Sequence, residues 1–177
     1  MSRIEIFTDI YAPPGRVFDL ARSIDLHVAT QTRHKERAVA GTTRGLIGPG
    51  ESVTWEAVHF GFRQRLTSRL APEFYDRPRR FRDSMVPGSG VFAGFDHDHI
   101  FETVPMIDGD GVAENEVSLA AMTRMIDVFD FRAPLGFAGR LVERIYLDRY
   151  MRGLLVERGA IIKRVAESDE WRDYLPA

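Results

Sequence analysis

Apolar residues recur at every second position through most of this chain between residues 35 and 132. Successive side chains of a β-strand point to opposite faces, so this period predicts a strand wherever it persists. We expect strands at residues 3–11, 37–40, 51–60, 62–70, 79–86, 94–104 and 118–131. Because mostly short loops join the later strands, the pattern favours an antiparallel meander over a parallel sheet.

Helices are predicted directly after the first strand and again at the C-terminal end. Pro13 and Pro14 end that strand, because proline has no ladder donor and fits the first turn of a helix. Two short helical segments follow, and Ser23 is expected to cap the second one, over residues 24–30. Residues 140–167 read as one long helix. Its predicted buried stripe consists of Leu147, Met151, Leu154, Leu155, Arg158, Ile162 and Val165, broken only by the arginine.

Three residues of this long helix carry separate expectations. Gly153 and Gly159 cost about 1 kcal/mol each relative to alanine, so we expect them to mark close packing or a bend. Alternatively, they leave room for a ligand beneath the helix. Leu154→Asp is expected to destabilise the domain severely, because the new carboxylate would be buried without a partner.

The composition is that of one ordinary globular domain covering residues 1–177, with 44% hydrophobic and 28% charged residues. A net charge of -2 gives no support to nucleic-acid binding. No apolar run approaches the ~20 residues of a membrane span, and the first residues lack a signal-peptide core. The absence of cysteine excludes disulfides, thiol nucleophiles and thiolate metal sites. These features predict a cytoplasmic protein.

Several short segments stand out within this order of elements. They are residues 10–14 (IYAPP), 17–18 (VF), 24–27 (IDLH), 81–85 (FRDSM), 97–99 (HDH), 101–102 (FE), 125–131 (MIDVFDF), 133–136 (APLG) and 149–151 (RYM). Together they resemble the START/Bet v1-like (SRPBCC) superfamily, in particular its bacterial polyketide cyclase/dehydrase-like branch. Residues 106–117 depart from that pattern as an expanded hairpin loop.

The resemblance implies an α+β helix-grip fold. A curved antiparallel sheet of about seven strands would wrap around the long C-terminal helix and leave a cavity between them, with two short helices after the first strand. The superfamily includes carriers, hormone receptors and enzymes, so the fold alone does not decide the function. The resemblance implies no metal and no cofactor.

The alternation also assigns each strand residue to the inner or the outer face of the sheet. With two residues of the long helix, the inner face predicts a cavity lined by Trp55, His59, Gln64, Leu66, Phe81, Asp83, Met85, Phe95, His97, His99, Phe101, Met125, Asp127, Phe129, Met151 and Leu155. The outer face carries Arg63, Arg65, Arg69, Arg80, Arg82, Asp96, Asp98 and Glu102. We expect these charges to pair across strands on a solvated surface, or alternatively to meet an anionic partner.

The polar residues of the inner face need partners, because an unpaired buried charge is costly. A mutually satisfied network of histidine and aspartate is one interpretation, and an anchor for the polar end of a greasy ligand is another. A third interpretation is zinc, since His97 and His99 lie about 6.8 Å apart on one strand face. Asp83 or His59 would then supply a further ligand. His27, in the second short helix, is expected to be an ordinary helix residue, or alternatively to lie at the mouth of the cavity.

Three functions follow from these expectations. The first is binding of a small hydrophobic molecule, such as a lipid or polyketide, without chemistry. The second is an enzyme of the cyclase, aromatase or dehydratase type, with His97, His99, Asp83 and Asp127 as candidate catalytic residues, histidine as base and aspartate as its orienter. The third is an interaction domain whose cavity is packed shut. A void of about 300 Å³ or more would support the first two. The sequence does not indicate an oligomeric state.

Overall fold

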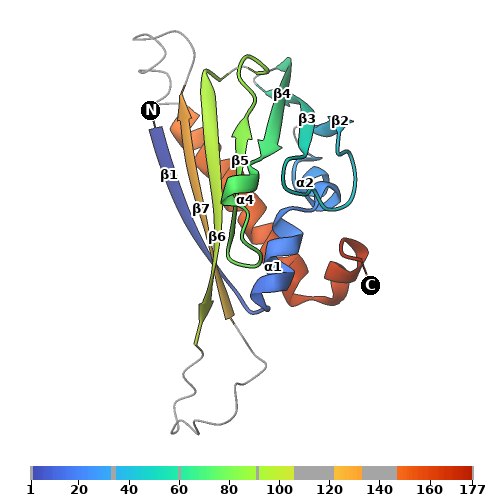
Figure 1. Cartoon of the computed structure of the whole chain (residues 1–177), viewed down its shortest axis with the longest axis vertical. Coiled ribbons are helices and arrows are strands. Elements are labelled where there is room, and N and C mark those ends of the chain that lie inside the picture. Colours follow the sequence, from blue (N-terminus) through green and yellow to red (C-terminus); the bar gives the residue numbers. More distant parts are fainter. Residues whose placement is uncertain are drawn as a thin grey trace, which may run out of the picture.

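The computed structural model describes residues 2–32, 35–59, 61–90, 92–105, 122–132 and 147–176, with only the backbone described at residue 59. The elements run in the predicted order, strand, two short helices, six strands and a long helix (Figure 1). They are β1 (Ser2–Ile10), α1 (Pro14–Ala21), α2 (Ile24–Thr30), β2 (Arg37–Gly41), β3 (Ser52–His59), β4 (Phe62–Leu70), η2 (Pro72–Phe74), β5 (Arg80–Met85), β6 (Gly94–Val104), β7 (Met122–Arg132), α4 (Asp148–Glu167) and η4 (Asp169–Asp173).

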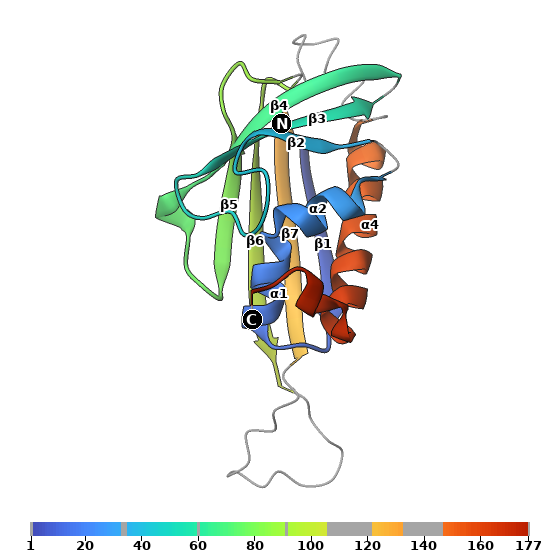
Figure 2. The ribbon, with the colours of Figure 1, turned by 90° about the vertical axis from the view of Figure 1, so that its right-hand side faces the viewer.

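The seven strands form one antiparallel sheet in the order β1-β7-β6-β5-β4-β3-β2. Consecutive strands are neighbours from β2 to β7, and β1 joins the far edge by pairing with the last strand. The sheet is bent, and α1, α2 and α4 lie on its concave side (Figure 2). This arrangement confirms the predicted helix-grip fold. Among the described helices, none is long and apolar enough to cross a membrane.

Local signals in the sequence explain how the short helices begin. Pro14 occupies the first turn of α1, directly after the extended Pro13. The Ser23 side chain accepts a hydrogen bond from the backbone N–H of Leu26, 3.3 Å away, and so caps α2 as predicted. The apolar face of α1, including Phe18, is buried against β6, β7 and α4. α1 therefore closes one end of the concave side.

The predicted helix 140–167 begins at Asp148 in the structure, and residues 140–146 lie outside the described part. Leu155, with 6% of its surface exposed, is the core residue of its turn, whereas Leu154 is only half-buried. The severe effect expected for Leu154→Asp therefore belongs to Leu155→Asp. A Cβ on Gly159 would lie 2.8 Å from Thr8 Oγ1, so close packing explains this glycine, while Gly153 has nothing within 4 Å.

The inner and outer faces are as predicted in the central strands. Phe81, His97, His99 and Phe101 are buried, and Arg63 and Arg65 are exposed. The Arg80 side chain was also expected to be exposed but is half-buried, because it lies over the Phe74 ring and near Asp98. Segments 106–117 and 118–121, predicted as a loop and the start of a strand, lie outside the described residues.

One outer-face carboxylate is buried, which the alternation did not predict. Glu56 keeps only 4% of its surface exposed. The guanidinium groups of Arg37 and Arg65 donate to it at 2.6 and 2.8 Å, and Arg63 lies 3.6 Å away. The arginine side chains themselves remain in water. Their hydrogen bonds hold the pKa of Glu56 below its usual value.

Candidate ligand-binding cavity and its polar cluster

A cavity of about 360 Å³ lies between the concave face of the sheet and helices α2 and α4. Most of its wall is aliphatic or aromatic. The predicted residues that line it are Trp55, Gln64, Leu66, Phe81, Asp83, Phe95, His97, His99, Phe129, Met151 and Leu155. The side chain of His59 lies outside the described part of the structure.

Met85, Phe101, Met125 and Asp127 do not line the cavity, although all four are buried. Phe101 and Met125 belong to the core beneath α1, where the Phe101 ring meets that of Phe18 edge-on at 5.3 Å. The alternation predicts the face of the sheet on which a side chain lies. It does not predict whether a helix or an empty space covers that part of the face.

The part of the cavity beside α2 contains polar residues, and the sequence analysis did not predict Gln31 and Glu36 among them. His27 lines the wall, stacks on Trp55 with 4.2 Å between ring centres, and places Nε2 2.9 Å from Glu36 Oε1. It is therefore more than an ordinary helix residue. The signal was present in the sequence, because Ile24, His27 and Gln31 follow helical spacing and all three line the cavity.

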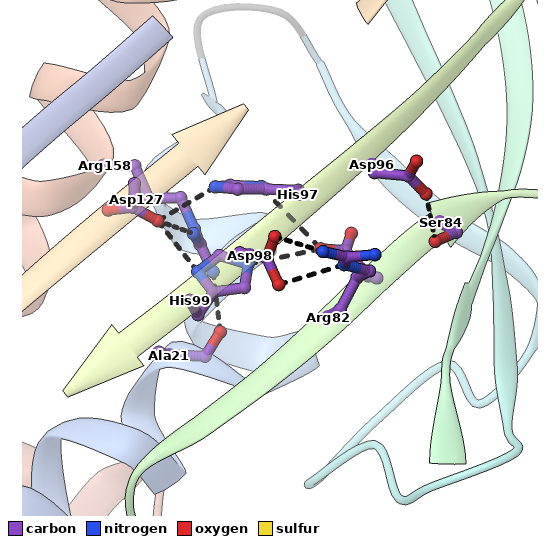
Figure 3. Close-up of polar contacts among 10 residues, drawn as sticks. Ala21, Arg82, Ser84, Asp96, His97, Asp98, His99, Asp127 and Arg158 are labelled. Atoms are coloured by element: carbon purple, nitrogen blue, oxygen red, sulfur yellow. Dashed lines mark hydrogen bonds and ion pairs between the residues drawn. The ribbon is translucent and has the colours of Figure 1, made fainter. Parts of the chain in front are cut away.

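The opposite part of the wall holds the predicted histidines and aspartates. Antiparallel pairing sets Asp83 of β5 opposite His97 of β6, and His99 of β6 opposite Asp127 of β7. All four side chains therefore share the inner face of three neighbouring strands. We call these residues, together with Arg158 of α4, the polar cluster. Figure 3 labels four of its members, His97, His99, Asp127 and Arg158.

Both imidazole rings lie between the same two carboxylates. His97 Nε2 is 2.9 Å from Asp127 Oδ1, and His99 Nδ1 is 2.8 Å from the same oxygen. This second contact lacks hydrogen-bond geometry, so charge attraction holds it. On the other side, Asp83 Oδ1 lies 3.2 Å from His99 Nε2 and 3.7 Å from His97 Nδ1. The two ring centres are 3.8 Å apart.

Arg158 completes the cluster from the long helix. Its Nη1 lies 3.6 Å from Asp127 Oδ1, and its Nη2 donates to the Ala21 carbonyl oxygen at 2.6 Å. Arg158 is buried. The residue that interrupts the apolar stripe of α4 is therefore also a member of the polar cluster on the sheet. The sequence placed Arg158 on the buried stripe but gave it no partner. Because burying an unpaired charge is costly, a carboxylate partner for Arg158 on the inner face of the sheet could have been predicted.

Neighbouring rings hold the imidazoles in place. Phe81 stacks on His99 at 4.3 Å, and Phe129 meets His97 edge-on at 5.3 Å. His97 and His99 are 7% and 2% exposed, so neither ring has room to turn freely. The Asp83 side chain is more open, with 27% of its surface exposed, and it lines the cavity. Asp83 is therefore the carboxylate that a bound molecule can reach.

The charges of the cluster balance when one imidazole is protonated, because two carboxylates and one guanidinium sum to -1. Burial alone would lower the pKa of His99, but its contacts with Asp127 and Asp83 raise it above its usual value. Burial and the nearby His99 lower the pKa of His97, despite its bond to Asp127. Burial would raise the pKa of Asp83, yet the His99 bond and neighbouring positive charges lower it to about 2.

No family model matches this chain, and no curated protein does. Solved structures match over nearly its whole length. TTHA0849 from Thermus thermophilus is 16% identical, with a TM-score of 0.63, over 93% of this chain and 99% of that one. The Zhui aromatase/cyclase from Streptomyces sp. R1128 is 13% identical, with a TM-score of 0.59, over 93% and 95%.

A plant protein gives a similar match. The major latex-like protein 151 from Panax ginseng is 14% identical, with a TM-score of 0.58, over 94% of this chain and 98% of that one. These neighbours are Bet v1-like (SRPBCC) proteins, which agrees with the resemblance found in the sequence. At such low identity the matches establish the fold, and the function has to be argued from the cavity.

Proposed function

We propose that residues 1–177 form one domain that binds a small, largely hydrophobic molecule in the cavity, with the polar end of that molecule at the polar cluster. The observation that carries this proposal is a cavity of about 360 Å³ whose mostly apolar wall includes Asp83, His97, His99 and Arg158 side by side. Small-molecule sites in proteins usually combine an apolar wall with a few convergent polar groups. We also expect the protein to be cytoplasmic and not to bind nucleic acid.

The two parts of the wall would contribute differently to binding. Each methylene group moved from water into the apolar part contributes about 0.8 kcal/mol. The cluster adds orientation, because Asp83 can accept a hydrogen bond while His99 and Arg158 can donate. A hydroxyl or carbonyl group at one end of a hydrophobic skeleton fits this combination. The cavity volume also argues against the alternative of an interaction domain with a closed core.

A cyclase- or dehydratase-type enzyme is the second candidate, and the pair of imidazoles in the cavity wall favours it. His97 and His99 lie side by side, and each is held by carboxylates, as a positioned acid or base must be. Two structural neighbours, Zhui and the di-domain protein BexL, are named aromatase/cyclases.

His99→Ala separates these two candidates once a ligand is known. An anchoring role predicts a loss of binding free energy of about 1–3 kcal/mol, the cost of an unsatisfied partner. A general base predicts nearly unchanged affinity and abolished turnover, because its role arises only in the transition state. A purely structural role predicts lower stability with no effect on either. We expect the first result.

The cavity itself can be tested with a matched pair of substitutions on β3. Ala57 is buried and lines the cavity, whereas the next residue, Val58, points to the outer face. Binding of the fluorescent probe 8-anilinonaphthalene-1-sulfonate should weaken by about tenfold or more in Ala57→Phe, because the new ring fills the void. Val58→Phe should bind like the wild-type protein.

Circular dichroism of both variants provides the control for folding. Equal probe affinity in the wild-type protein and both folded variants would show that the probe does not enter this cavity, and would contradict the proposal. Failure of the wild-type protein to bind the probe at all would contradict it as well.

A further inference from the structure

Two carboxylates orient both histidine rings of the polar cluster, which is more than an anchor for a ligand requires. Each histidine contacts Asp127 through one ring nitrogen and turns the other nitrogen toward Asp83 Oδ1. The hydrogen-bonded contact of His97 Nε2 with Asp127 is of the kind that typically holds a metal-binding histidine, with the second ring nitrogen against a carboxylate that fixes the ring. Here a single buried carboxylate serves both rings.

The three inward atoms have the spacing of metal ligands. Asp83, His97 and His99 each have a ligand atom within 4.8 Å of those of the other two. Asp83 Oδ1 lies 3.7 Å from His97 Nδ1 and 3.2 Å from His99 Nε2. Ligands that are each about 2.0–2.2 Å from a metal ion lie roughly 3–3.6 Å from one another. Small side-chain shifts would therefore suffice to surround an ion. No other such group exists among the residues that the structure describes.

We propose that Asp83, His97 and His99 bind a divalent transition-metal ion, with Asp127 as the positioning residue for both imidazoles. The charge of the cluster favours a cation, because two carboxylates face one guanidinium. Arg158 opposes the ion only in part, since it contacts Asp127 and the Ala21 carbonyl oxygen rather than Asp83.

The donor set narrows the choice of ion. Two imidazole nitrogens and one carboxylate oxygen suit zinc, cobalt, iron or nickel, whereas calcium and magnesium prefer oxygen ligands alone. Three protein ligands leave a coordination position free. Asp83 lines the cavity, so an oxygen atom of a bound molecule could occupy that position. This last step rests on the proposed function, but binding of the ion does not.

The test uses the full, untagged chain after treatment with EDTA and dialysis. Titration with Zn²⁺ by calorimetry, and with Co²⁺ by visible absorption, should show one saturable site per chain with the spectrum of nitrogen and oxygen ligands. Asp83→Asn, which keeps the size of a partly exposed side chain, should lose this site. Asp127→Asn should weaken it by about 10–100-fold, as expected of a carboxylate that positions ligands.

His27→Gln is the matched control, because His27 also lines the cavity but pairs with Glu36 away from the cluster. It should bind the ions like the wild-type protein. Absence of saturable binding in the wild-type chain, or full binding by folded Asp83→Asn, would overturn the metal site. Probe binding in EDTA-treated protein is a separate measurement, so a failed metal site and a failed hydrophobic cavity give different results.

Discussion

The two faces of strands β5 and β6 carry charged groups only one residue apart, yet the groups are arranged differently. On the outer face, the guanidinium of Arg82 donates to both carboxylate oxygens of Asp98, at 2.9 and 2.6 Å (Figure 3). Arg80 Nη2 lies 3.5 Å from the same carboxylate, so these outer-face charges pair with one another. On the inner face, Asp83 shares two imidazoles with a second carboxylate and still borders a cavity.

The difference in arrangement supports separate roles for the two groups of charges, the outer group in the fold and the inner group in the proposed site. A cross-strand pair such as Arg82–Asp98 contributes modestly to the stability of a solvated sheet. Burial of the inner charges carries a large desolvation cost, so a well-packed apolar core of the same volume would often be equally stable. We therefore interpret the polar cluster as a feature of the proposed binding site, although its removal would still harm the fold.

The largest expected effect compares the two faces directly. Asp127→Asn leaves Arg158 and the histidines without their shared charge and should lower the free energy of unfolding by about 3 kcal/mol or more. Asp98→Asn on the outer face should cost about 1 kcal/mol or less. Urea unfolding of both variants measures the difference. Similar losses would mean that the two faces are energetically alike.

Lowering the pH should destabilise the metal-free protein through the inner-face carboxylate Asp83. The pKa of Asp83 is about 2 in the folded chain against an ordinary 3.8, with His97, His99 and Arg158 as the nearby positive groups. A lowered carboxylate pKa gives stability that is complete above the unfolded value and is lost as the pH falls through the folded value. Stability should thus decline between about pH 4 and pH 2, by on the order of 2 kcal/mol for this group.

Asp83→Asn provides the comparison for that measurement. Its unfolding free energy, determined with urea in the presence of EDTA, should depend less steeply on pH over this interval than that of the wild-type protein. Parallel curves would show that the Asp83 carboxylate has no special interaction in the folded state.

The smallest effect extends the contrast to α4. Gly153→Ala should raise the free energy of unfolding by about 1 kcal/mol, because the exposed site has space for a methyl group and alanine favours helix. Gly159→Ala should lower it, since the new methyl group would meet Thr8 of β1. Thermal unfolding is sufficient to compare the two. Stabilisation by both substitutions would mean that α4 packs less closely on β1 than described.

The sequence was sufficient to predict the faces of the strands. The alternation around His97 and His99 gave their burial, and the register then brought Asp83 and Asp127 beside them. It could not predict the depth of the cavity, because a period of two says nothing about the helix above the sheet. Phe101 was therefore predicted to line the cavity, although α1 covers it.

Contacts between elements far apart in the sequence could not be predicted either. Arg158 was recognised as a break in the apolar stripe, but its partners, Asp127 and the Ala21 carbonyl oxygen, come from β7 and α1. The stack of His27 on Trp55 likewise joins α2 to β3. Such contacts depend on the curvature of the sheet and the angle of α4, and neither can be read from local patterns.

The central claim is that a small molecule occupies the cavity beside the polar cluster. Native mass spectrometry of the chain purified from its own host tests it most directly, with Ala57→Phe prepared in parallel. We predict a non-covalent small-molecule adduct on the wild-type protein and its loss in the variant. A wild-type chain without any adduct, or the same adduct on both proteins, would contradict the account.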